Sequence, residues 1–189
     1  MEFYLIIAFI STLVWLTMPI VYRNNRHFYF FLFLALNDSL SIILWTVFSV
    51  SSQLLWIPIH YLILLSYERY WLTKYKFWIL IGFIPILILT YFSTTKIQLF
   101  YVLVTNIALF LLFVKPLVVK FFNSHLNLFY LVMSFYELIT ITKLIIFIKK
   151  GFLGMEAFYI GTIFQIIMGI VLIYIGKFNK ELTIVSEDS

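Results

Sequence analysis

The chain has 189 residues, of which 64% are hydrophobic and only 11% are charged, and its mean hydropathy is +1.08. Soluble domains are roughly half apolar and about a quarter charged, so this composition excludes an ordinary soluble domain. Apolar runs such as residues 3–22 and 77–92 do not alternate with polar residues as barrel strands would. Lipid leaves only helices or closed barrels as spanning structures, so the prediction is an all-α, polytopic transmembrane helix bundle.

Seven apolar segments follow one another, each close to the roughly 20 residues that a spanning helix needs. They cover residues 3–22, 28–50, 54–72, 77–94, 97–119, 126–148 and 157–177, with short polar breaks between them. No break is long enough to fold by itself. We therefore expect one transmembrane domain over residues 1–178, followed by a polar cytoplasmic tail over residues 179–189.

Basic residues predict the orientation, because Lys and Arg accumulate on the cytoplasmic side of membrane proteins. With seven spans, the side that holds the C-terminus carries nine of them: Arg23, Arg26, Arg69, Lys74, Lys76, Lys115, Lys120, Lys177 and Lys180. The other side carries Lys96, Lys149 and Lys150. The count places the N-terminus outside and the C-terminus in the cytoplasm. The Lys149-Lys150 pair runs against the rule, so the seventh span is the least supported part of the count.

The first and fifth segments align with each other at a shift of 97 residues, and the second and sixth at a shift of 99. The alignment superimposes two of the chain's four prolines, Pro19 and Pro116, and the two carboxylates that lie deep in segments, Asp38 and Glu137. The breaks that follow the first and fifth segments also contain one histidine each, His27 and His125. We predict two parallel repeats, about 3–72 and about 97–177, around a linker helix of about 77–94. Chance matching in a low-complexity apolar sequence is the alternative explanation.

Each aligned proline is followed by basic residues: Arg23 and Arg26 after Pro19, and Lys120 after Pro116. This arrangement resembles the SWEET and PQ-loop membrane proteins, which carry a Pro-Gln dipeptide at the cytoplasmic end of the first helix of each three-helix unit. The glutamine is absent from both positions here. The resemblance implies a seven-helix, 3+1+3 architecture that passes a small solute by rocking of its halves, with Pro19 and Pro116 as hinges.

Asp38 and Glu137 are the strongest candidates for function. A charged side chain at the centre of a bilayer costs about 2.5–3.5 kcal/mol even on the lenient insertion scale, so two at matching depth indicate an inward-facing polar centre. Such carboxyls could bind and release protons during transport. The alternative is a structural hydrogen bond between helices, with the acids permanently protonated.

Lys143 is the only lysine or arginine that lies away from the ends of a segment. It lies six residues after Glu137, hence about 120° around the helix and about 9 Å along it, which is too far for an intrahelical pair. We expect a partner on another helix, with Asp38 as the first candidate. The alternative is a side chain that snorkels to the outer interface.

Asn106, Gln165 and His60 complete the predicted polar site, although amides inside membranes also join helices. The leading prediction is a small-solute transporter of the inner (cytoplasmic) membrane, with proton coupling. The alternative is a non-transporting sensor or a subunit of a larger envelope complex. Beyond lipid and a small polar solute or protons, the expected partners are a second copy or another membrane protein, and not nucleic acid. We find no enzyme signature, and we expect neither cofactor nor metal.

Overall fold

The computed structural model describes residues 2–49, 53–122, 127–150 and 155–178, and these residues form helices and no strands. The predicted all-helical class is therefore confirmed. The helices are α1 (Glu2–Val21), α2 (Phe28–Thr46), α3 (Gln53–Leu65), α4 (Arg69–Lys74), α5 (Lys76–Phe92), α6 (Thr95–Phe122), α7 (Leu128–Lys150) and α8 (Met155–Phe178). The predicted tail over residues 179–189 and His125 lie outside the described residues.

Three helical stretches are long and apolar enough to cross a membrane: Thr95–Phe122, Leu128–Lys149 and Phe158–Phe178. Four shorter apolar stretches accompany them: Leu5–Val21, Phe28–Leu44, Leu55–Leu65 and Lys76–Phe92. The outward surfaces of these helices carry large exposed apolar side chains such as Phe9, Phe100 and Ile167. A helical bundle with this surface suits lipid as its solvent.

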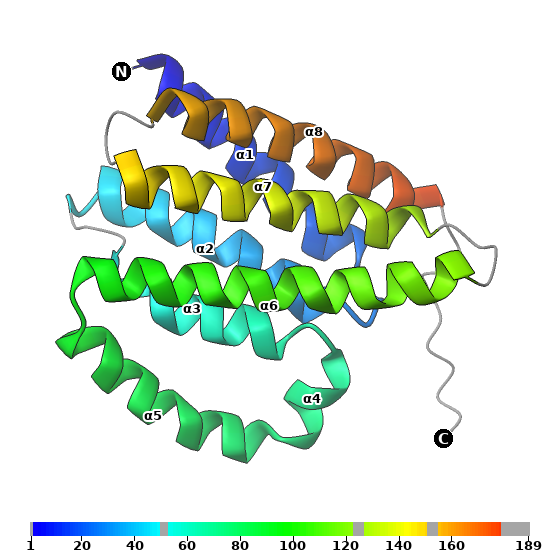
Figure 1. Ribbon diagram of the computed structural model, residues 1–189, viewed down its shortest axis with the longest axis horizontal. Coiled ribbons are helices and arrows are strands. Elements are labelled where there is room, and N and C mark those ends of the chain that lie inside the picture. The colour runs from blue at the N-terminus through cyan, green and yellow to red at the C-terminus, as the bar shows by residue number, and fades with distance from the viewer. Residues whose placement is uncertain (1, 50–52, 123–126, 151–154, 179–189) are drawn as a thin grey trace.

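Six helices close a ring. Each of α1, α2, α3, α6, α7 and α8 packs on the next in that order, and α8 packs back on α1. The helix α5 lies outside the ring against α3, and the short helix α4 joins the two (Figure 1). Figure 1 also shows α1, α3, α6 and α8 running in one direction and α2, α5 and α7 running in the other.

The order of neighbours in the ring has a twofold pattern. Moving three places around the ring carries α1 to α6, α2 to α7 and α3 to α8. The contacts correspond in the same way: α1 packs on α2 as α6 packs on α7, α2 packs on α3 as α7 packs on α8, and α3 packs on α6 as α8 packs on α1. The parallel direction of α1 and α6 fits the same relation (Figure 1). This is the arrangement that two parallel three-helix repeats around a linker would produce, although the repeat itself remains a prediction.

The third apolar segment differs from its prediction. We expected one helix over residues 54–72, but α3 ends at Leu65 and α4 begins at Arg69, after Glu68 in an extended conformation. Tyr67 lies in the break, where its hydroxyl donates a 2.8 Å hydrogen bond to the Leu112 carbonyl of α6. The helix α3 thus ends two residues before the tyrosine that hydrogen-bonds to α6.

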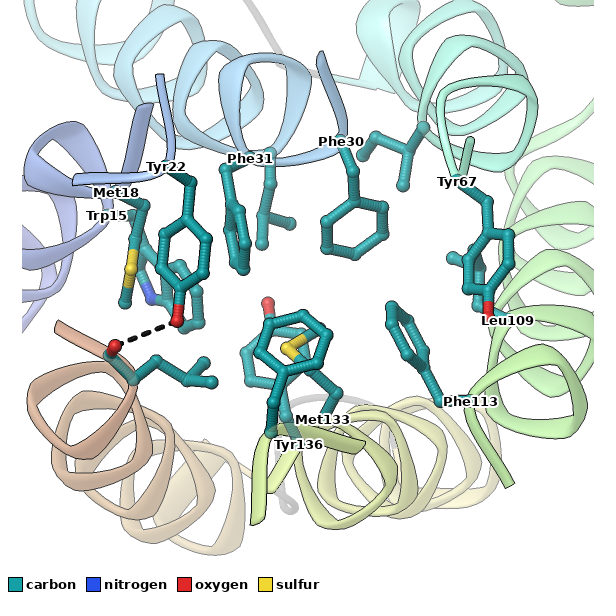
Figure 2. Close-up of a cluster of buried hydrophobic side chains, with 14 of the residues drawn as sticks. Trp15, Met18, Tyr22, Phe30, Phe31, Tyr67, Leu109, Phe113, Met133 and Tyr136 are labelled. Atoms are coloured by element: carbon teal, nitrogen blue, oxygen red, sulfur yellow. Dashed lines mark hydrogen bonds between the residues drawn. The ribbon is translucent and has the colours of Figure 1, made fainter. Parts of the chain in front are cut away.

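Aromatic side chains close the interior of the ring near the α1–α2 connection. We call this group the aromatic plug: Tyr22, His27, Phe30, Phe31, Tyr67, Phe113, Phe129 and Tyr130, all buried. Figure 2 shows five of them, which point into the ring from the end of α1, from α2, from the α3–α4 connection and from α6: Tyr22, Phe30, Phe31, Tyr67 and Phe113. The Tyr22 hydroxyl donates a 2.8 Å hydrogen bond to the Leu172 carbonyl and so connects this end of α1 to α8.

His27 is the polar centre of the plug. Its Nδ1 donates to the Tyr67 carbonyl at 2.8 Å, and its Nε2 accepts from Arg26 Nε at 3.1 Å, which fixes a neutral tautomer. Its ring stacks on Phe129 with centroids 5.0 Å apart. Burial lowers the pKa of His27 to about 3, and the neighbouring Arg26 charge acts in the same direction.

Candidate functional site

A cavity of about 320 Å³ lies inside the ring, on the other side of the plug from the α1–α2 connection. All six helices of the ring contribute to its wall. The wall includes every polar residue that the sequence singled out: Asp38, His60, Asn106, Glu137, Lys143 and Gln165. Asp38 and Glu137 thus face one shared space.

Helical spacing explains how the polar wall is built. On α7, Glu137, Thr140 and Lys143 recur every three residues, and on α8 Thr162 precedes Gln165 by the same interval. Residues three or four apart share one helix face, so these side chains form an inward stripe on otherwise apolar helices. Sequence reasoning missed Thr140 and Thr162, although their spacing from Glu137 and Gln165 was the signal that could have found them.

Lys143 is held against α8. Its ammonium donates to Thr162 Oγ1 at 2.9 Å and to Gln165 Oε1 at 2.7 Å, and it lies 4.1 Å from the centroid of the Phe158 ring. Gln165 Nε2 in turn donates to Thr140 Oγ1 on α7 at 2.7 Å. These four side chains and Lys143 form what we call the lysine clamp.

The lysine clamp confirms that Lys143 has partners on another helix, but it corrects the choice of partner and excludes the snorkelling alternative. Lys143 is only 9% exposed, so it does not snorkel to the interface. Its hydrogen-bond partners lie on α8 instead of being Asp38, which acts on the ammonium only through space. The reason is that α8 packs directly beside α7 in the ring, whereas α2 does not.

The side of the cavity that carries the two carboxyl groups has fewer hydrogen bonds than the lysine clamp. Glu137 is 1% exposed, and its Oε2 has no hydrogen-bond partner among the described residues. Asp38 Oδ1 accepts a long hydrogen bond of 3.3 Å from the neighbouring Asn37 amide. The buried Oδ1 of Asn37 likewise has no partner within the described part of the chain.

Asn106 and His60 hydrogen-bond to their own helices. Asn106 Nδ2 donates to the Val102 carbonyl at 2.7 Å, and His60 Nδ1 lies 2.8 Å from the Trp56 carbonyl. Within the described residues neither side chain hydrogen-bonds to a second helix, which was the alternative explanation for the amides, whereas Gln165 does join α8 to α7.

The predicted hinges lie away from the cavity. Pro19 is in the last turn of α1, and α6 continues through Pro116 to Phe122. No group of three or more His, Asp or Glu side chains suited to a metal ion occurs among the described residues.

A second cavity of about 290 Å³ adjoins the first and shares Asn37, His60 and Lys143 with it. It extends past Trp56 on α3 and Leu99 on α6, toward the end of the bundle where α1 begins. The polar site is thus approached from that end, while the aromatic plug closes the opposite end.

Comparison of the chain with models of known protein families, with curated proteins and with solved structures finds no match. Any function assigned to the chain therefore rests on the site itself.

Proposed function

We propose that this protein is a small-solute transporter with seven membrane spans, whose substrate site is the polar cavity inside the helix ring. The spans are α1, α2, α3, α5, α6, α7 and α8, with α4 at the cytoplasmic surface. The observation that carries the proposal is the shared cavity, which gathers two acids, a lysine and three further polar residues from five helices of an apolar bundle. Intramembrane ionisable residues that face one cavity are typical of solute and proton pathways.

The two ends of the cavity support alternating access. One end continues into the second cavity, and the other is closed by the aromatic plug. With the N-terminus outside, as the basic residues predict, this is an outward-facing arrangement. Rocking of the α1–α2–α3 unit against the α6–α7–α8 unit would separate the plug, because His27 belongs to one unit and Phe129 to the other.

Proton coupling would use Asp38 and Glu137, since a carboxyl inside a dry bundle can change its charge when the cavity changes access. The test is proton flux into proteoliposomes, followed with a pH-sensitive dye, as a panel of small polar solutes is offered. The variant Asp38→Asn with Glu137→Gln should abolish solute-driven proton flux. The exposed acid at the start of α8 supplies the control, Glu156→Gln, which should keep the flux. Unchanged flux in the double variant would remove the coupling role.

The alternative function is a non-transporting sensor or a subunit of a larger complex. The observation that favours it is α5, which packs mainly on α3 and leaves apolar residues such as Ile84 and Ile88 exposed. A partner that copurifies in fixed stoichiometry after gentle extraction, together with no flux for any solute, would support this alternative.

A further inference from the structure

Among the fully buried polar side-chain atoms of the cavity wall, only hydrogen-bond acceptors lack a partner within the described residues. The fully buried wall atoms without a hydrogen bond among the described residues are Glu137 Oε2 and Asn37 Oδ1, and both are acceptors when the Glu137 carboxyl is ionised. They come from α7 and α2, on different sides of the ring. The Asn37 amide nitrogen donates to Asp38, which leaves the amide oxygen as the free acceptor.

The only ammonium on the wall is already engaged. Lys143 donates two hydrogen bonds within the lysine clamp, and its ammonium nitrogen lies over the Phe158 ring. An ammonium has three donors and no acceptor, so little of Lys143 is left for an anion. The cavity is therefore poorly prepared for an anionic solute and well prepared for a solute that brings donors.

The floor of the cavity, next to the plug, is aromatic. Trp15 and Tyr136 both line the cavity, and their ring centroids lie 4.7 Å apart. Tryptophan and tyrosine faces attract cations, most strongly where water is excluded. Both residues are buried, so this floor adds an apolar surface that can attract a cation through its aromatic rings, beneath the acceptors.

The size of the cavity excludes a bare inorganic ion as the best-fitting occupant. Its 320 Å³ corresponds to roughly ten waters at about 30 Å³ each. An occupant that fills this space has several non-hydrogen atoms. A small hydrocarbon body could rest on the aromatic floor while a polar head reaches the acceptors above it.

We propose that the cavity binds a small organic cation with N–H donors, a primary ammonium or a guanidinium, through Glu137 Oε2 and Asn37 Oδ1 over the Trp15 floor. The nearby Asp38 carboxylate supplies further negative charge. The inference deepens the proposed transport function by naming a class of solute, but binding itself is independent of transport and is measured separately.

The experiment measures the binding of matched probes to the full chain in lipid nanodiscs by calorimetry. The probes are propylammonium, tetramethylammonium, 1-propanol, propionate and sodium. Propylammonium should bind most tightly. Tetramethylammonium has the charge without the donors, so its affinity should be at least about tenfold lower, as expected for lost hydrogen bonds to a charged group. Propanol, propionate and sodium should show no saturable binding.

Variants then locate the site. Glu137→Gln should weaken propylammonium binding at least about tenfold, whereas the exposed control Glu156→Gln should leave it unchanged. If Glu137→Gln fails to fold, Asn37→Asp decides instead, because a second charge at the acceptor should tighten propylammonium binding. The inference is overturned if propanol, propionate or sodium binds more tightly than propylammonium, if no probe binds, or if the variants do not change the affinity.

Uptake into proteoliposomes separates the two proposals. Saturable propylammonium binding without uptake of any solute would refute transport and leave the cation site standing. Uptake of a neutral or anionic solute, without propylammonium binding, would refute the cation site and leave transport standing.

Discussion

Gly161 of α8 should be essential to the lysine clamp because it makes room for the stem of Lys143. A Cβ atom at this position would lie 2.7 Å from both Cγ and Cδ of Lys143, and 3.4 Å from Ile139 Cγ2. Carbon atoms normally approach to about 3.5–4.0 Å, so Gly161→Ala requires the stem to move by roughly 1 Å. The stem cannot move freely, since its ammonium is tied to Thr162 and Gln165.

The free energy of unfolding should fall by about 0.5–2 kcal/mol in Gly161→Ala. Overpacking costs about 1–3 kcal/mol, and the loss of one charge-assisted hydrogen bond costs about 1.5–3 kcal/mol when the stem shifts to relieve it. The higher helix propensity of alanine returns about 1 kcal/mol. The net effect is a clear destabilisation by a substitution that helix propensity alone predicts to be favourable.

A double-mutant cycle with Lys143 isolates this contact. Unfolding free energies would be measured by SDS titration in mixed micelles for Gly161→Ala, Lys143→Ala and the double variant. Without the lysine stem, Gly161→Ala should become neutral or stabilising by up to about 1 kcal/mol, so the two effects should not add. Lys143→Met keeps most of the stem without its ammonium and should give an intermediate result. Additive effects in the cycle would refute the packing of Lys143 against Gly161.

Three further predictions concern the aromatic plug and the topology. His27 takes up a proton at its ordinary pKa of 6.5 when unfolded but only near pH 3 when folded, so lowering the pH from about 7 to about 5 should cost about 2 kcal/mol of stability. SDS titrations at the two pH values would show this loss, and His27→Gln should remove it; an equal loss in the variant would contradict the assignment. Tyr67→Phe loses the hydrogen bond to the Leu112 carbonyl and should lower the unfolding free energy by about 1 kcal/mol, measured in the same titration. The chain has no cysteine, so single cysteines report topology without a background: Asn24→Cys should react with an impermeant maleimide only from the cytoplasmic side and Thr94→Cys only from outside. Labelling of both from one side would contradict the proposed seven spans.

The candidate site was largely predictable from the sequence, and its internal contacts were not. Asp38 and Glu137 stand out because lipid penalises charge, and that penalty applies whatever the helices pack against. The choice of partner for Lys143 depends on which helix lies beside α7 and how it is rotated. Thr162 is an unremarkable residue in the sequence and becomes a ligand of the ammonium only because α8 is that neighbour.

The aromatic plug shows the same division. The sequence places His27 in a polar break between two segments, but the side chain is fully buried because rings from α6 and α7 close over the α1–α2 connection. Likewise, hydropathy continues through residues 54–72, so it could not show that the helix ends at Leu65. The end of α3 lies next to Tyr67, which hydrogen-bonds to His27 and Leu112, two residues far from it in the sequence.

Composition and the absence of strand-like alternation determined that the chain is helical and suited to lipid, because the polar backbone groups of an apolar segment in a bilayer must be hydrogen-bonded within the helix. The spacing of rare charged residues determined which side chains face inward. Only the tertiary structure decided that six helices close a ring, that one end of the ring is sealed by aromatic rings, and that the acids face a common cavity. These features depend on helix order and rotation, which arise from packing between segments far apart in the chain.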